Sequence, residues 1–118
     1  MIKGIGFAFS GILQSIKTEA NFKIYLYAII FVIAMGLFFH LSLFEWLWVL
    51  LATCLVIAAE LMNTAMESLA NIVSPDFHPL IKKAKDAAAG SVLIMAFFAL
   101  ITAIFIFAPK IINLIYTR

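Results

Sequence analysis

Charged side chains are scarce in this sequence. Its 118 residues include 8 Lys and Arg and 6 Asp and Glu, whereas 66% of them are hydrophobic. The net charge of +2 comes without an arginine-rich or aromatic-interleaved basic patch, which argues against a nucleic-acid partner. The apolar residues form long blocks instead of short alternations, so we expect a membrane protein of one domain, residues 1–118.

Cysteine pairs and the common nucleotide-binding motifs are also missing. The single cysteine, Cys54, lies within an apolar run, so no intrachain disulfide can form. The sequence has no G-x-x-x-x-G-K-[ST] loop, no protein-kinase glycine loop, no H-E-x-x-H and no zinc-binding cysteines. If the chain uses ATP, it must do so at a site of another kind.

Three apolar runs are long enough to cross a bilayer as helices. They comprise residues 21–39, 46–66 and 87–108. In residues 1–17, apolar side chains recur at helical spacing opposite lysines and small polar residues, which indicates an amphipathic helix lying on the membrane surface. The predicted fold class is therefore an all-α membrane protein with one surface helix and three transmembrane helices.

The segment between the last two runs carries helix boundary signals. Ser74-Pro75-Asp76 is typical of a helix N-cap followed by proline at the first helical position. His78-Pro79 interrupts the chain again, and we expect the last helix to run from near Leu80 and to end at Pro109.

The distribution of cations predicts the orientation. Six lysines lie before the first run, at its start, or between the second and third runs, and two cations follow the third run: Lys3, Lys17, Lys23, Lys82, Lys83 and Lys85 against Lys110 and Arg118. The positive-inside bias then places the N-terminus in the cytoplasm and the C-terminus outside. For Lys82 and Lys83, this topological role is favoured over a catalytic one.

Two carboxylates and an amide interrupt the second run. Glu60, Asn63, Thr64 and Glu67 follow one another at i, i+3, i+4 and i+7, so they share one face of a helix. An ionisable group at membrane depth costs roughly 2.5–3.5 kcal/mol on insertion scales, which favours a functional role for Glu60.

Further polar residues are expected at the same cytoplasmic level. They are Glu19, Lys23, Asp76, His78, Lys85 and Asp86. Carboxylates, an amide and lysines at one depth suit phosphoryl transfer, which needs oxygen ligands for Mg²⁺, cations for phosphates and a base for a hydroxyl proton. Spacing does not decide every role, because Glu19 and Lys23 at i, i+4 suit a structural ion pair equally well, and a histidine beside a proline is more often a loop residue.

Three motifs follow one another in the second half of the chain. They are E-L-M-N-T-A-M-E at 60–67, S-P-D-F-H-P-L at 74–80 and A-K-D-A-A-A-G-S-V-L at 84–93. Together with Gly6-Phe7-Ala8, Gly11 and residues 19–22, they resemble the prokaryotic diacylglycerol kinase family of small integral-membrane lipid kinases. The likeness covers nearly the whole chain.

This resemblance implies an ATP- and Mg²⁺-dependent lipid kinase of the bacterial cytoplasmic membrane, assembled as a homotrimer with active sites between subunits. By position, Glu60 resembles the general base, and Glu60 with Asn63 would meet the lipid. Glu19 and Glu67 resemble the Mg²⁺ ligands. The expected nucleotide contacts are Phe7, Glu19, Glu67, Asp76, Phe77, His78, Lys85 and Asp86.

The chain departs from the family pattern at two positions. Asn71 stands where the family commonly has an aspartate, and Phe7 where many members have a tyrosine. The His-Pro-Leu and Ala-Lys-Asp-Ala-Ala-Ala-Gly segments resemble the undecaprenol kinase branch more than the diacylglycerol branch, although diacylglycerol stays open as the main substrate. The sequence is also compatible with a proton- or cation-coupled transporter that uses Glu60, or with a relative that binds ATP without turnover.

Overall fold

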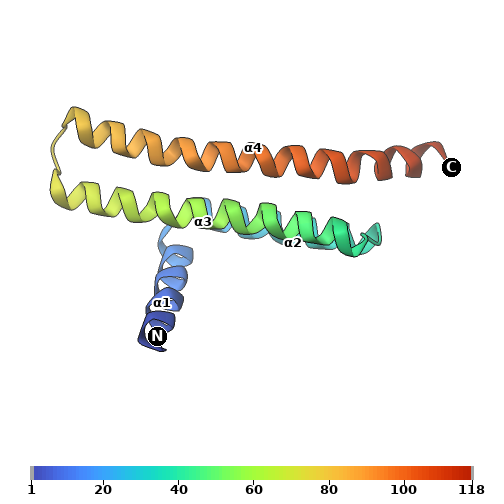
Figure 1. The fold of residues 1–118 in the computed structure, drawn as a ribbon, viewed down its shortest axis with the longest axis horizontal. Helices are drawn as coiled ribbons and strands as arrows, with labels where there is room; N and C mark the ends of the chain where they lie inside the picture. The colour runs from blue at the N-terminus through green and yellow to red at the C-terminus, as the bar shows by residue number, and fades with distance from the viewer. Residues whose placement is uncertain (1, 118) are drawn as a thin grey trace.

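The computed structural model describes residues 2–117, which form four helices (Figure 1). These are α1 (Ile2–Thr18), α2 (Ala20–Phe38), α3 (Leu43–Val73) and α4 (Pro79–Tyr116). The three helices α2, α3 and α4 are long and apolar enough to cross a membrane, and α1 lies crosswise to them (Figure 1). The predicted all-α membrane fold is thus confirmed. Met1 of the expected surface helix and Arg118 of the expected outer cations lie outside the described residues.

A tight turn joins α2 to α3. The N–H of Leu41 donates to the Gly36 carbonyl over 3.2 Å, and the N–H of His40 donates to the Leu37 carbonyl over 3.4 Å. These two bonds form a Schellman motif, which ends α2. His40 takes the left-handed conformation that this motif requires, with φ of 55°. Ser42 and Glu45 then form a reciprocal capping box that starts α3. We call this end of the bundle the turn end.

The buried core lies near the turn end. It consists of Leu41, Val49, Ile106 and Phe107, with partly buried neighbours from all three long helices. An ion pair between Glu45 of α3 and Lys110 of α4, 2.9 Å long, joins two helices beside this core.

The predicted end of α4 at Pro109 is wrong. The helix continues through Pro109 to Tyr116. Proline removes one backbone hydrogen bond and crowds the preceding turn, but apolar helices tolerate one such loss where neighbouring groups compensate. The residue directly after the proline, Lys110, pairs with Glu45 of α3.

The start of α4 also differs from the prediction. Ser74 ends α3, and its hydroxyl donates to the Asp76 carbonyl over 3.0 Å. The N-cap of α4 is His78, whose Nδ1 accepts the Leu80 N–H over 3.1 Å, with Pro79 at the first helical position. The N-cap and the proline that begin α4 are therefore His78 and Pro79, four residues after the predicted Ser74 and Pro75. We call residues 74–78 the loop end of the bundle.

The long helices do not pack equally. Helices α3 and α4 contact each other along most of their length, whereas α2 comes close to α3 at few positions and its backbone stays apart from α4. One close approach is at the turn end, where Gly36 of α2 lies against the Trp46 indole. Helix α1 joins the bundle between the loop end and the turn end (Figure 1).

Candidate active site

Glu60 is a buried carboxylate on the continuous helix α3. The residue is 4% exposed, and it lies well inside α3, away from both ends of the helix. The charged groups that act on it electrostatically are Glu19 and Glu67. Three of the predicted site carboxylates are therefore gathered around one stretch of α3.

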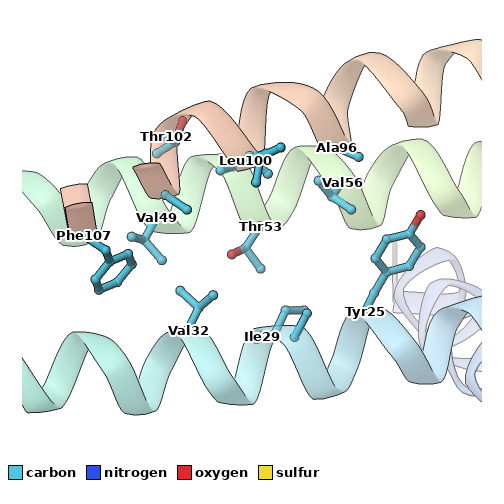
Figure 2. A pocket seen from close by; sticks show the side chains of 14 residues that line it. Tyr25, Ile29, Val32, Val49, Thr53, Val56, Ala96, Leu100, Thr102 and Phe107 are labelled. Carbon is cyan, nitrogen blue, oxygen red and sulfur yellow. The ribbon is translucent and has the colours of Figure 1, made fainter. Parts of the chain in front are cut away.

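Tyr25 of α2 is a neighbour of Glu60 that was not among the predicted site residues. The Tyr25 hydroxyl points towards α3 (Figure 2), and the two side chains are close enough to interact electrostatically. Two phenols, Tyr25 and Tyr27, lie in the first apolar run, and they were the available signal. The distance between two separate helices cannot be judged from sequence spacing, so this neighbour emerges only from the fold.

The side-chain amide of Asn63 forms a hydrogen bond with Glu67, the second carboxylate on this face of α3. Its Nδ2 donates to Glu67 Oε1 over 3.3 Å, in a partly buried i, i+4 pair. The other amide atom, Asn63 Oδ1, is buried and has no hydrogen-bond partner among residues 2–117. A buried acceptor without a donor costs roughly 1–3 kcal/mol, so this atom is a candidate ligand for a cation or a substrate hydroxyl.

Glu19 reaches the site from the junction of α1 and α2. It is the extended residue between the two helices, and its N–H donates to the Ser15 carbonyl over 2.9 Å. Phe22, 2% exposed, and the buried Ser15 fix this junction in the bundle. The ion pairs within residues 2–117 are Lys82–Asp86 and Lys110–Glu45. A Glu19–Lys23 ion pair, which the spacing allowed, is thus not realised in the described chain.

A pocket of about 470 Å³ lies between α1 and α3. Two predicted nucleotide contacts, Phe7 and Glu19, line it, together with Thr64 and Ser68 from α3. We call it the α1–α3 pocket. It holds one aromatic ring and one carboxylate from the predicted set.

A second pocket of about 310 Å³ lies at the loop end. Five predicted nucleotide contacts line it: Asp76, Phe77, His78, Lys85 and Asp86. We call it the loop pocket. Within residues 2–117 the predicted nucleotide contacts are thus divided between two pockets, and Glu67 lines neither of them.

Two polar contacts hold the cations of the loop pocket. Lys85 Nζ donates to Asn71 Oδ1 over 2.7 Å, between α4 and α3. Lys82 Nζ lies 2.6 Å from Asp86 Oδ2 within α4. The sequence predicted neither contact. It marked Asn71 only as a departure from the family pattern, and it assigned Lys82 only a role in topology. The i, i+4 spacing could have revealed the second pair, whereas the first joins residues 14 apart and requires the fold.

The predicted metal ligands form no complete protein site. Within residues 2–117, no three His, Cys, Asp or Glu side chains are arranged to hold a metal ion. Glu19, Glu67 and the unpartnered Asn63 oxygen are nevertheless hard oxygen donors of the kind that Mg²⁺ takes. Mg²⁺ usually keeps several waters and takes further ligands from substrate phosphates, so one or two carboxylates are sufficient.

Comparison with known proteins adds to this geometry. A model of the family described as prokaryotic diacylglycerol kinase matches residues 6–107. An undecaprenol kinase of Bacillus subtilis (strain 168) is 38% identical over 101 residues, which cover 86% of this chain and 82% of that protein. A diacylglycerol kinase of Synechocystis is 35% identical, covering 92% of this chain and 62% of that protein. A diacylglycerol kinase of Escherichia coli (strain K12) is 24% identical, covering 86% of this chain and 84% of that protein.

Proposed function

The chain belongs to the prokaryotic diacylglycerol kinase family of membrane lipid kinases, and we propose that it transfers the γ-phosphoryl group of ATP to the hydroxyl of undecaprenol. The observation that carries this proposal is the buried Glu60 carboxylate, flanked by Glu19 and Glu67, on an apolar helix. Similarity to an undecaprenol kinase supports the polyprenol as acceptor. Diacylglycerol is the alternative acceptor, because other similar proteins are diacylglycerol kinases.

Glu60 is the proposed general base. The lipid hydroxyl oxygen attacks the γ-phosphorus, its proton passes to the Glu60 carboxylate, and the bond from the γ-phosphorus to the bridging oxygen breaks to release ADP. A positioned base contributes typically 10²–10⁴-fold to such a step. Burial of Glu60 supports this role, because water is kept away from a group that must meet a membrane alcohol.

Glu19, Glu67 and Asn63 are the proposed metal-binding residues. Their oxygens would hold the Mg²⁺ ion that accompanies ATP, and the Asn63 Nδ2 donor orients the Glu67 carboxylate. When bound, Mg²⁺ would neutralise part of the negative charge on the phosphates of ATP. Asn63, next to Glu60 on the same face, is also the proposed polar contact for the lipid head.

The nucleotide is proposed to contact both pockets. In the loop pocket, Lys85 offers a cation for phosphate oxygens, and Asp76, Phe77, His78 and Asp86 complete its polar and aromatic lining. The Phe7 ring in the α1–α3 pocket can stack on a base without a hydroxyl contact.

We also propose a homotrimer whose active sites form between subunits. The division of the nucleotide contacts between two pockets of one chain supports this arrangement. The lysine distribution supports a cytoplasmic N-terminus and loop end, with the C-terminus outside. Both pockets would then face cytoplasmic ATP.

The activity is tested with purified protein in micelles, γ-labelled ATP, Mg²⁺, and either undecaprenol or diacylglycerol. Labelled lipid should form, and faster with undecaprenol. Absence of labelled product with both lipids would overturn the proposed activity. ATP binding without turnover would favour a catalytically inactive relative, and pH-dependent flux in liposomes without lipid product would favour the transporter.

A further inference from the structure

Lys82 of α4 lines the loop pocket, although the sequence assigned it only a role in topology. It follows His78 by four residues and precedes Lys85 and Asp86 by three and four, so these residues share one face of the helix. All four of them line the pocket. Lys83 lies about 100° further round the helix and is not part of the lining in the described chain. Of the two lysines assigned to topology, one is therefore placed among the proposed nucleotide contacts.

The charges that line the loop pocket call for a second cation. Apart from Lys82, the charged side chains of the lining are Lys85, Asp76 and Asp86, which are one cation and two carboxylates. A phosphate that met these three alone would approach a pocket of net negative charge, which repels it. Lys82 brings the formal charge of the lining to zero. The proposed contact between Lys85 and a phosphate is therefore more favourable with Lys82 present.

The position of Lys82 at the start of α4 is unfavourable for the helix alone. Lys82 is the fourth residue of α4, counted from Pro79, and the N-terminal end of a helix carries a partial positive charge. This charge repels a lysine in the first turns unless an anion is near. A bound phosphate, in contrast, is stabilised by the helix end and by the lysine together. The location of Lys82 therefore suits a bound anion.

The ion pair with Asp86 leaves Lys82 able to bind a ligand. Lys82 Nζ lies 2.6 Å from Asp86 Oδ2, and the two side chains are 63% and 64% exposed. Exposed i, i+4 pairs on a helix shift an equilibrium by only roughly twofold. A polyphosphate carries several negative charges, so it attracts the ammonium more strongly than one exposed carboxylate does. The ammonium also has three N–H donors, so a bond to Asp86 leaves two for a phosphate.

Resting on the proposed kinase function, we propose that Lys82 is a second phosphate-binding cation of the loop pocket and acts with Lys85 on the phosphates of ATP. It sets the affinity for ATP and takes no part in the proton transfer to Glu60. A phosphorylated lipid head group has the same anionic chemistry. The nucleotide is favoured as the ligand because Lys82 shares the pocket with the other proposed nucleotide contacts.

Removing the charge of each lysine in turn tests the proposal. Lys82→Gln should raise KM for ATP roughly 3- to 10-fold, as expected for the loss of one charge-assisted hydrogen bond, and leave kcat and KM for the lipid nearly unchanged. Lys83→Gln removes the same charge at the neighbouring position outside the pocket, and it should change none of these constants. Lys82→Arg keeps a cation and should hold KM for ATP within roughly twofold of the wild type. An unchanged KM for ATP in Lys82→Gln overturns the proposal.

Adenosine distinguishes a phosphate contact from a disturbed pocket. It shares the base and the sugar with ATP but carries no phosphate, so its inhibition constant should be the same in the wild type and in Lys82→Gln. An equal rise in the adenosine constant and in KM for ATP would show a structural effect and overturn the proposal. An equal rise of KM for ATP in Lys82→Gln and Lys83→Gln would also overturn it, because general attraction by surface charge would explain both.

The composition of the micelles separates nucleotide phosphate from lipid phosphate. The kinetics are measured in an uncharged detergent, with and without the anionic lipid phosphatidylglycerol. The higher KM for ATP in Lys82→Gln should appear in both kinds of micelle. A rise confined to micelles that contain phosphatidylglycerol would assign Lys82 to lipid head groups and overturn the proposal.

Acylation of lysines in the wild type tests the same contact without a substitution. ATP with Mg²⁺ should protect Lys82 and Lys85 from an acylating reagent and leave Lys83 reactive, whereas adenosine should protect none of them. Unchanged reactivity of Lys82 in an enzyme that phosphorylates lipid overturns the proposal while the kinase function stands. A wild type in which ATP protects Lys82 but no lipid is phosphorylated would overturn the kinase function alone.

Discussion

Lys85 of α4 donates a hydrogen bond to Asn71 of α3 over 2.7 Å, at the rim of the loop pocket. Asn71 stands where resemblance to the family leads us to expect an aspartate. A neutral amide holds the Lys85 ammonium in place without neutralising its charge. The lysine therefore remains a full cation for the phosphates of the proposed nucleotide.

Changing Asn71 to a carboxylate should weaken ATP binding. In Asn71→Asp, the new charge would pair with Lys85, and exposed pairs of this kind are worth about 0.2–1 kcal/mol. KM for ATP should accordingly rise roughly 1.5- to 5-fold with kcat nearly unchanged. Steady-state kinetics at saturating lipid measures this shift. The same change at Asn113, near the end of α4 away from both pockets, is the matched control, and an equal shift there would refute the role of the pair.

Removing the charge of Glu67 should raise the Mg²⁺ requirement. Glu67→Gln loses the carboxylate that Asn63 orients, so the Mg²⁺ concentration for half-maximal rate should increase roughly 10-fold or more. Mg²⁺ titrations of the initial rate provide the measurement. Glu45→Gln, the same substitution at the turn end, should leave the requirement unchanged. An unaltered Mg²⁺ curve for Glu67→Gln would argue that this residue is no ligand.

The contact between Gly36 and Trp46 should make Gly36 intolerant of a side chain. A Cβ at Gly36 would overlap the indole ring, and overpacking of this kind costs typically 1–3 kcal/mol. Gly36→Ala should therefore lower Tm in detergent, followed by circular dichroism. Gly90→Ala should keep or raise Tm, because a Cβ there meets nothing within 4 Å and alanine favours a helix. Equal Tm values for the two variants would show that α2 does not pack on α3 at this point.

Local patterns predicted much of the fold. Apolar runs of bilayer length gave three spanning helices, and helical spacing in residues 1–17 gave α1. The helix ends were predicted less well. The Ser74 and Pro109 signals are local propensities: His78, not Ser74, caps α4, and the helix continues through Pro109.

The candidate site, too, was predicted only in part from the sequence. The helical period alone put Glu60, Asn63 and Glu67 on one face, and the Asn63–Glu67 hydrogen bond agrees with it. Periodicity gives no information about distances between helices. The nearness of Tyr25 to Glu60, the Lys85–Asn71 bond and the apolar pocket between α2, α3 and α4 (Figure 2) all depend on how separate helices pack, so they required the structure.

The rate of phosphoryl transfer from γ-labelled ATP to undecaprenol, compared between the wild type and Glu60→Gln at equal occupancy by ATP, tests the central claim most directly. Glutamine has nearly the shape of glutamate but cannot accept the proton. We predict that the wild type forms labelled lipid, and that Glu60→Gln binds ATP normally yet is slower by at least roughly 10²-fold. A Glu60→Gln variant that transfers phosphate at the wild-type rate would contradict the assignment of Glu60 as the base.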